Sequence, residues 1–485
     1  MKFTRFYRIA AGLLAALLLV GSLVACGSTD PAETTDVPET REPETLPDLT
    51  DNRTPTDLDP AELYSSRLHA VFGDATPAPA TDFAYTVSDG GVTLTAYLGE
   101  KTVAILPETI EDKPVVAIAK SAFSGREDLH GLYIPDTVTD IEMGALAGCK
   151  KLTALRTPMA AASGRIHFGS LFGAETYETN GSYVPDKLVT LMLTRGTKIE
   201  PYAFYDCDLE VVLLPTTLTE IGEFAFYGNE KLLQASPAYT ALTTVGERAF
   251  ANCSSLLAMD LPATVTSVGF AMLEGCTALT DLTVPFVGAT RDGVVPETET
   301  ETETETGEED RLSTNHLAYI FGARAYVHSN GYVPASLVRV TLLAGCGDIP
   351  ANAFFECASI REVVIPDGVT AIGYRAFYGC ERLSTIALPD SVRKIGDDAF
   401  NGCIRLVSVD VGKGLKTLGV QAFMGCVSLP EMTLPATVKG IPNAAFAGCT
   451  SLATLTAPGV TEVGAQAFRH CDKLSGWSAE TALAD

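Results

Sequence analysis

Basic charge is scarce in this 485-residue sequence. It has 34 Lys and Arg residues against 60 Asp and Glu residues, and its net charge is −26. Nucleic acids and anionic lipid surfaces are both bound mainly through clusters of Lys and Arg. The charge balance therefore argues against a nucleic-acid partner and against direct binding to a bare anionic membrane.

Motifs that carry catalysis or bind metal are also missing. The six histidines are scattered, and the sequence contains no G-x-S-x-G, no H-E-x-x-H, no phosphate-binding glycine loop and no C-x-x-C pair. A pair of catalytic carboxylates would leave no short signature. However, repeats, leader and tether account for almost every residue, so the sequence predicts no enzyme activity, no cofactor and no metal site.

Long apolar runs are confined to the N-terminus. Residues 1–25 combine Lys2, Arg5 and Arg8 with an apolar stretch that ends in L-V-A-C, a pattern typical of a secretory signal. The last four residues are similar to a bacterial lipobox, and this resemblance implies that Cys26 becomes the lipid-modified first residue of the mature protein. The alternative is an ordinary signal peptide beside an incidental cysteine. No apolar run after Ala25 could span a membrane.

A repeat of about 23 residues dominates the rest of the chain. Five phenylalanines are spaced 23 residues apart, a sixth follows after 22, and a cysteine stands three residues after each one. The phenylalanines are Phe354, Phe377, Phe400, Phe423, Phe446 and Phe468. A fixed period of this length predicts stacked units, because one unit cannot bury its apolar face alone.

Each repeat contains the same order of local signals. Val363 and Ile365 alternate as in a strand, and Pro366 ends the run because proline cannot donate to a strand ladder. Phe377 and Cys380 have the spacing of one face of a helical turn. The repeat therefore predicts a strand, a turn, a second short strand and a helical turn.

The repeat L-x-x-I-x-L-P-x-x-V-x-x-I-G-x-x-A-F-x-x-C resembles the BspA-like leucine-rich repeats of bacterial surface proteins. Clear copies are IREVVIPDGVTAIGYRAFYGC at 360–380 and LSTIALPDSVRKIGDDAFNGC at 383–403, and the resemblance extends from Phe83 to Trp477. It implies an α/β repeat fold, a right-handed leucine-rich-repeat solenoid with a parallel sheet. Such solenoids serve as binding surfaces and do not carry one particular chemistry.

Seven glycines recur in the turn after the second apolar pair: Gly222, Gly246, Gly269, Gly373, Gly396, Gly419 and Gly464. In two other repeats Pro350 and Pro442 take this place, and proline fixes φ near −65°. The glycines are therefore expected to allow neighbouring turns to approach closely, not to supply a positive φ.

Ten of the twelve cysteines occupy one position of the repeat, and Asn229 takes that position once. Parallel side chains on successive turns lie alongside one another, and each cysteine would have two equal neighbours. We therefore expect buried free thiols that bond to the loop backbone, not disulfides.

Two longer segments interrupt the period and match each other. Their shared residues include His167 and His316, and the sequences align Asn180-Gly181 with Asn330-Gly331. Because each histidine recurs inside a duplicated structural unit, a packing role is expected in preference to metal binding.

Composition divides the chain into further segments. Residues 26–59 are rich in Thr, Pro and acids, and residues 297–310 alternate Glu with Thr, so both are expected to be disordered. Alternation around Asp-Gly-Gly predicts a capping hairpin near Phe83. The predicted segments are a lipoprotein signal (1–25), an acidic tether (26–59), a short helix and linker (60–81), an N-terminal cap (82–118), a first repeat array (119–296), an acidic tract (297–310), a second array (311–477) and a tail (478–485).

The outward strand positions form the predicted binding face, for which we name Tyr133, Arg156, Arg361, Glu362 and Asp410. This face has few aromatic residues, which favours a protein partner over a glycan. The sequence thus predicts a monomeric, lipid-anchored surface protein that binds a host or bacterial protein in adhesion or cell contact and touches the membrane only through its lipid. A non-binding envelope spacer and a glycan-binding protein are the alternatives.

Overall fold

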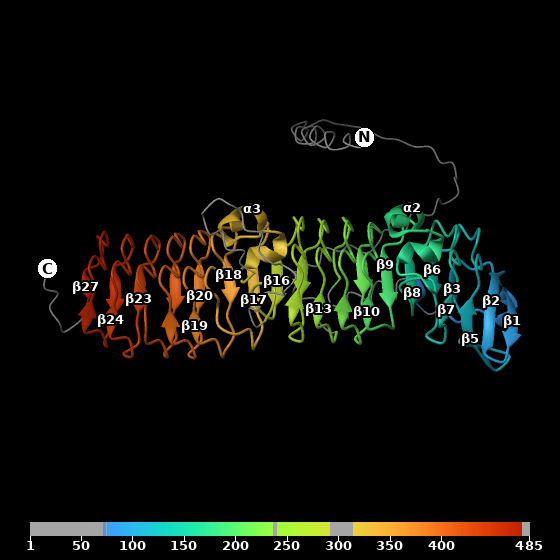
Figure 1. Cartoon of the computed structure of the whole chain (residues 1–485), viewed down its shortest axis with the longest axis horizontal. Coiled ribbons are helices and arrows are strands. Elements are labelled where there is room, and N and C mark those ends of the chain that lie inside the picture. Colours follow the sequence, from blue (N-terminus) through green and yellow to red (C-terminus); the bar gives the residue numbers. More distant parts are fainter. Residues whose placement is uncertain (1–70, 74, 236–239, 292–313, 478–485) are drawn as a thin grey trace, which may run out of the picture. The chain divides into compact units, whose positions relative to one another are not determined.

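The computed structural model describes residues 71–73, 75–235, 240–291 and 314–477. All of them belong to one of the two units of the chain, which runs from Arg53 to Asp485. Figure 1 shows its turns following one another in a single row from β1 to β27. The repeat unit is therefore one turn of a solenoid, as the period predicts.

Each regular turn contributes one strand of about three residues to a row of parallel sheets that we call the strand face. These strands are β3 (Val103–Ile105), β6 (Gly131–Tyr133), β8 (Ala154–Thr157), β9 (Thr190–Leu193), β11 (Val211–Leu213), β14 (Ala258–Asp260), β16 (Asp281–Val284), β17 (Arg339–Leu342), β18 (Glu362–Val364), β20 (Thr385–Ala387), β22 (Ser408–Asp410), β23 (Glu431–Thr433), β25 (Thr454–Thr456) and β27 (Gly476–Trp477).

A second set of two-residue strands forms the short-strand face. Its members are β7 (Asp140–Ile141), β10 (Lys198–Ile199), β12 (Glu220–Ile221), β13 (Thr244–Val245), β15 (Ser267–Val268), β19 (Ala371–Ile372), β21 (Lys394–Ile395), β24 (Gly440–Ile441) and β26 (Glu462–Val463). The segment that contains the repeated phenylalanine closes each turn, and we call the surface it forms the turn face.

Strand pairing keeps each residue beside its counterpart in the next repeat. In β20 and β22, for example, Thr385 pairs with Ser408 and Ile386 with Val409, in parallel. The middle residue of β20 is buried and both flanking residues are exposed. Alternate burial therefore places the apolar residue of each strand inside the solenoid and aims the others at solvent.

The N-terminal end has a different topology. There β1 (Phe83–Ser88) and β2 (Gly91–Tyr97) form an antiparallel hairpin, and β4 (Thr109–Ile110) pairs antiparallel with β5 (Lys113–Ile118). A one-turn 3-10 helix, η1 (Ala80–Asp82), precedes the hairpin. Since β2 also pairs in parallel with β5, the hairpin connects directly to the stack of turns.

The expected helical turn around the phenylalanine is a run of backbone turns and not a helix. Bonds of the i to i−3 type are present, as from the Cys380 N–H to the Phe377 carbonyl at 3.2 Å. However, Arg375 and Gly379 have φ values of 51° and 68°. Because a right-handed helix needs a negative φ at every residue, these two positions prevent one from forming.

The phenylalanines form a continuous column in the second array. Neighbouring rings from Phe354 to Phe468 are stacked with centroids 5.0 to 5.8 Å apart and planes within 5° of parallel. The backbone follows the same ladder, since the Phe377 N–H donates to the Ala399 carbonyl of the next repeat at 2.7 Å. Side chains and main chain thus couple each turn to both neighbours.

The glycines of the second turn are required for close approach, as predicted. None of the seven has a positive φ. A Cβ on Gly396 would lie 2.8 Å from the carbonyl carbon of Gly373, and one on Gly373 would lie 2.5 Å from the carbonyl carbon of Pro350. Any side chain at these positions would press on the backbone of the preceding repeat.

The eleven cysteines among the described residues are free and buried, which confirms the expectation for the thiols. Their typical contact is a hydrogen bond to the carbonyl of the phenylalanine in the preceding repeat, from Cys380 to Phe354 at 3.1 Å and from Cys403 to Phe377 at 3.2 Å. Burial raises the pKa of Cys426 to about 12. The cysteine column therefore supplies hydrogen-bond donors to buried carbonyls of the preceding repeat.

Asn229 replaces the thiol for a reason that the structure makes plain. Its amide donates to the Phe204 carbonyl at 2.7 Å, as a cysteine would, and also to that of Phe226 at 2.9 Å. Its side-chain oxygen accepts from the Leu209 N–H at 3.1 Å. The loop after Cys207 is one residue shorter than in regular repeats, so Leu209 lacks the usual i−3 carbonyl and Asn229 supplies an acceptor.

The two longer segments, which we call variant modules, share one backbone. The first contains η2 (Phe168–Phe172), η3 (Tyr177–Thr179) and α2 (Asn180–Tyr183), and the second contains η4 (Leu317–Phe321), η5 (Tyr326–His328) and α3 (Ser329–Tyr332). Because α2 begins at Asn180 and α3 at Ser329, the match of Asn180-Gly181 with Asn330-Gly331 was wrong by one residue.

Each variant module continues the backbone ladder in both directions. On one side the Leu146 N–H donates to the Leu171 carbonyl at 2.8 Å, and on the other the Phe168 N–H donates to the Ala203 carbonyl at 2.7 Å. The second module repeats this arrangement at equivalent positions. The insertions therefore extend one turn of the solenoid without breaking the stack.

Several predicted features lie outside the described residues. They are the signal with Cys26, the acidic tether, the first part of the short helix, the acidic tract and the C-terminal tail.

Candidate binding surfaces

Exposed side chains of the strand face form two rows in the second array. One row joins Thr385 to Ser408 and the other joins Ala387 to Asp410, through the register of β20 and β22. Strands β23 and β25 continue the pattern, since Glu431 pairs with Thr454 and Thr433 with Thr456. Most of these side chains are small, so a partner could approach the strands closely.

Tyr133 and Arg156, two of the predicted binding residues, lie together on neighbouring strands. The guanidinium carbon of Arg156 is 4.2 Å from the centroid of the Tyr133 ring. Arg156 also donates to the Ile134 carbonyl at 2.7 Å and forms an ion pair with Asp136 at 3.0 Å. The charge of this arginine is thus shared between an aromatic face and a carboxylate of the same chain.

Two further contacts complete this cluster. The ring of Phe72 meets Tyr133 edge-on with centroids 6.1 Å apart, and a Cβ on Gly131 would lie 2.7 Å from Val71. Partial burial opposes ionisation of Asp136, but hydrogen bonds from Thr194 and Arg156 outweigh it and lower the pKa of this carboxyl. The segment before the cap therefore packs over this end of the strand face, and Tyr133 is engaged within the protein.

The other three predicted residues lie further along the stack. Arg361 is exposed, Glu362 forms an ion pair with Arg339 at 3.0 Å, and one Asp410 oxygen accepts from the Gly412 N–H at 3.0 Å. β6 and β8 belong to one sheet, β18 to a second and β22 to a third. The five residues therefore share a face without forming one site.

An aromatic cluster on the turn face was missed by the sequence reasoning. Tyr205 and Tyr227 follow the repeated phenylalanine in successive repeats, and their rings stack 5.1 Å apart and within 6° of parallel. Beside them Tyr202 stacks on Phe224 at 5.0 Å, and Tyr177 of the first variant module stacks on Tyr202 at 4.3 Å. The signal was visible as the aromatic residue after the phenylalanine in AFYDC and AFYGN.

A groove of about 270 Å³ opens beside this cluster. Its lining residues are Tyr205, Asp206, Tyr227, Gly228, Glu230, Asn252, Ser254 and Gly275. Ala251 takes the next position after Tyr205 and Tyr227, so the column of rings ends there and one side of Tyr227 is not stacked. We call this space the tyrosine groove.

The tyrosine groove is acidic. Partial burial, together with the charge of Asp208, raises the pKa of the Asp206 carboxyl. Burial likewise raises the pKa of the Tyr205 hydroxyl. The nearby Lys231 ammonium is paired with Asp208 at 2.9 Å.

A similar aromatic column follows the second variant module, but there an arginine of the chain lies against the rings. Tyr326 meets Phe355 at 5.1 Å, and Phe355 stacks on Tyr378 at 5.1 Å. Here Arg375 lies with its guanidinium carbon 5.3 Å from the centroid of the Tyr378 ring and pairs with Asp398 at 3.5 Å. A cation of the chain itself thus occupies this aromatic column.

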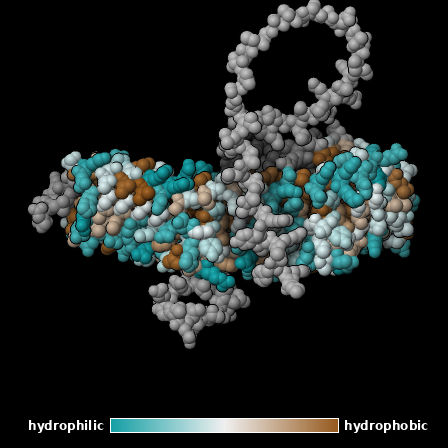
Figure 2. Space-filling view, turned by 90° about the horizontal axis from the view of Figure 1, so that it is seen from above, coloured by the Kyte–Doolittle hydropathy of each residue, from teal (hydrophilic) through white to brown (hydrophobic). Residues whose placement is uncertain are grey.

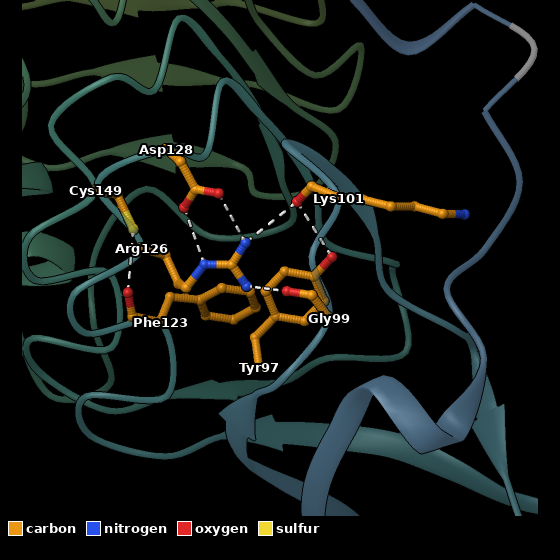
Figure 3. Close-up of polar contacts among 7 residues, drawn as sticks. All are labelled: Tyr97, Gly99, Lys101, Phe123, Arg126, Asp128 and Cys149. Carbon is orange, nitrogen blue, oxygen red and sulfur yellow. Dashed lines mark hydrogen bonds and ion pairs between the residues drawn. The ribbon is translucent and has the colours of Figure 1, made fainter.

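Figure 3 shows a third arginine held in this way, near the N-terminal end. The guanidinium carbon of Arg126 is 4.6 Å from the centroid of the Tyr97 ring, its Nε donates to Asp128 at 3.0 Å, and it also bonds to the Gly99 carbonyl. Arg126 takes the position that cysteine holds in later repeats. Its stem and charge cover the start of the column where no earlier phenylalanine is available.

The buried histidines of the variant modules support the packing interpretation. His167 is buried with its Nδ1 3.0 Å from the Asn180 side-chain oxygen, and His316 is fully buried in the second module. Within the described ranges, no group of three or more His, Cys, Asp or Glu residues is placed to hold a metal. The same ranges contain no helix that is both long and apolar enough to cross a membrane.

Comparison with known families gives a match to the BspA type leucine rich repeat region, in six copies over residues 106–164, 195–289 and 347–475. A leucine-rich repeat protein of Bacteroides ovatus is 22% identical, with 83% of this chain and 93% of that chain covered and a TM-score of 0.33. A leucine rich cell surface protein of Faecalibacterium prausnitzii is also 22% identical, with coverages of 83% and 94% and a TM-score of 0.26. No curated protein matches the chain.

Proposed function

Because this chain belongs to the family of BspA-type leucine-rich-repeat proteins, we propose that it is a bacterial surface module that binds a protein partner, in adhesion or cell contact, and is anchored by a lipid on Cys26. Leucine-rich repeats generally mediate protein–protein interaction through extended surfaces. The proposal assigns no catalytic role to any residue.

The observation that carries protein binding is the pair of exposed rows on the strand face of the second array. Along β20, β22, β23 and β25 the outward residues are small or of mixed charge, and β20 is in register with β22 and β23 with β25. Val364 on β18 adds an apolar side chain that is 41% exposed. A partner could therefore contact many repeats at once without having to displace bulky side chains.

A capture experiment tests this proposal. The chain from Gly27 onward, with Cys26 and the signal removed, is immobilised and exposed to bacterial surface extracts and to host matrix proteins. We expect saturable capture that Arg361→Ala with Asp410→Ala weakens. The matched control, Lys416→Ala with Glu462→Ala, also removes one charge of each sign, but from the exposed short-strand face. Equal loss in both variants, or no capture at all, contradicts the proposal and favours a spacer.

The lipid anchor is tested separately. A fatty-acid probe fed to cells should label the wild type, whereas Cys26→Ala should stay unlabelled and be released from the membrane. Equal labelling and retention of both proteins would contradict the anchor and leave the binding proposal unaffected.

A further inference from the structure

The chain places an arginine over a tyrosine ring at three sites and supplies a carboxylate at each. The three sets are Tyr97 with Arg126 and Asp128, Tyr133 with Arg156 and Asp136, and Tyr378 with Arg375 and Asp398. A guanidinium is planar and weakly hydrated, so it can lie on an aromatic face while its N–H groups bond a carboxylate. The recurrence indicates that a tyrosine ring beside a carboxylate suits an arginine side chain.

The tyrosine groove contains the ring and the carboxylates without the arginine. Tyr227 provides the ring, and Asp206 and Glu230 provide the acids. Among the described residues, no arginine lies over Tyr205 or Tyr227. Arg248, in the next repeat, lies instead over Phe270 at 5.6 Å and over Phe224 at 5.9 Å, and it is bonded to Glu274 at 2.9 Å.

Equivalent positions explain the difference. Tyr227 and Tyr378 both follow the phenylalanine of the second repeat after a variant module. Three residues before each of them the chain has Phe224 in the first case and Arg375 in the second. The first array therefore has a phenylalanine at the position where the second array has the internal cation.

Asp206 adds evidence because it is unfavourable for the protein alone. It has a φ of 54°; the equivalent positions of later repeats hold Gly228 (φ 77°) and Gly275 (φ 75°), and also Asn252 (φ 60°), Glu356 (φ 50°) and His470 (φ 63°). A residue other than glycine in this region is strained, even though Asp tolerates it better than most. Its carboxyl is also partly buried beside Asp208, and both effects raise its pKa. A bound cation would offset this destabilisation.

We propose that the tyrosine groove receives an arginine side chain of a partner protein, whose guanidinium lies against Tyr227 and pairs with Asp206 and Glu230. The proposal rests on the protein-binding function above and adds a contact on the turn face of the first array, separate from the rows of the strand face. A volume of about 270 Å³ is near the lower limit for small-molecule pockets and suits a single side chain. In the view of Figure 2, the hydrophobic residues among those described are scattered between hydrophilic ones.

The test uses the chain from Gly27 onward with blocked tripeptides as probes. Acetyl-Gly-Arg-Gly-amide should bind about tenfold more tightly than the same peptide with citrulline, which keeps the shape and removes the charge. Binding should weaken as salt rises, because an ion pair at a surface groove is screened. Ligand-observed NMR titration measures both effects.

Variants locate the binding. Asp206→Asn removes the charge with little change of shape, and Tyr227→Leu removes the ring; each should reduce binding of the arginine peptide to the level of the citrulline peptide. Tyr378→Leu is the matched control, because its column is already occupied by Arg375, and it should bind like the wild type. A urea unfolding curve for each variant shows that the stack remains folded.

Three results would overturn the inference: equal affinity for arginine and citrulline peptides, equal loss in Tyr378→Leu, or preferential binding of neutral oligosaccharides that Tyr227→Leu abolishes. Failure of the wider function is distinguishable. Binding of the arginine peptide without capture of any protein contradicts the protein-binding proposal alone, whereas capture that Asp206→Asn leaves intact contradicts the groove alone.

Discussion

In the second array every rung of the central column is a phenylalanine from Phe354 to Phe468, whereas the first array has leucine at Leu146 and Leu273. Each of these leucines comes immediately before a variant module, where the next turn is supplied by η2 or η4. The first array also has one shortened loop, one asparagine in the cysteine column and the tyrosine groove. Regular repeats thus build a uniform stack, and the departures from regularity create distinct surfaces.

The largest effect is expected from breaking the regular column. Phe400→Ala removes a fully buried ring between Phe377 and Phe423, and we expect it to destabilise the surrounding repeats by roughly 3–5 kcal/mol. Phe468→Ala, at the end of the column, should only loosen the last repeat. Limited proteolysis with mass mapping should show a nick near residue 400 in the first variant alone. Identical patterns would mean that the column is not the core.

A smaller effect is expected from separating two turns. Gly396→Ala would place a methyl group against the backbone of Gly373, which should destabilise the protein by about 1–3 kcal/mol. Gly440→Ala is the matched control, since its nearest atom would be 3.9 Å away. Urea unfolding should shift for the first variant and not for the second. A shift of equal size in both would contradict the close-approach role.

The short loop after Cys207 allows a test of why Asn229 replaces the usual cysteine. Asn229→Cys restores the usual residue of its column, yet it leaves the Leu209 N–H without the acceptor that Asn229 supplies at 3.1 Å. A buried donor without a partner costs about 1–3 kcal/mol, so the consensus residue should destabilise the protein. An unfolding curve equal to or better than that of the wild type would show that the short loop is not the reason for Asn229.

The smallest expected change concerns thiol reactivity along the column. Burial raises the pKa of Cys276 and of Cys426 to about 12, so both should resist alkylation in the native state from neutral to moderately alkaline pH. Cys471 is 8% exposed at the end of the column and should react before Cys403, which is fully buried. Mass spectrometry after timed alkylation gives the order. Reaction of Cys403 first would contradict the order of reactivity expected from burial.

The repeat period, the paired strands, the free thiols and the role of the glycines could be predicted because each depends on a pattern repeated many times. The strand alternation at Val363 and Ile365, for instance, is decided by burial of one face. The tyrosine groove could not be predicted in this way. Whether Tyr227 points outward depends on the left-handed residues of the turn, such as Phe224 at φ 52°, and the sequence pattern suggested a helical turn there.

The sequence pattern also could not show that Tyr227, among the described residues, has no arginine over its ring as Tyr378 has. The difference becomes visible only when Phe224 and Arg375 are compared at equivalent positions. For the strand face, the pattern predicted which residues lie on or beside the strands. It could not show that Phe72 packs against Tyr133.

We expect Asp206 to contribute to arginine binding and to oppose folding. Its folded-state pKa is raised, so its ionised form opposes folding above that pKa, and this unfavourable contribution disappears as the pH falls below the ordinary range of a carboxyl. Asp206→Gly also removes the strain of a positive φ. Urea unfolding and titration of the arginine peptide on this one variant are therefore the most direct test. For Asp206→Gly we expect greater stability near neutral pH, a smaller gain in acid, and loss of arginine binding; lower stability, or unchanged binding, would contradict the role of Asp206 in the tyrosine groove.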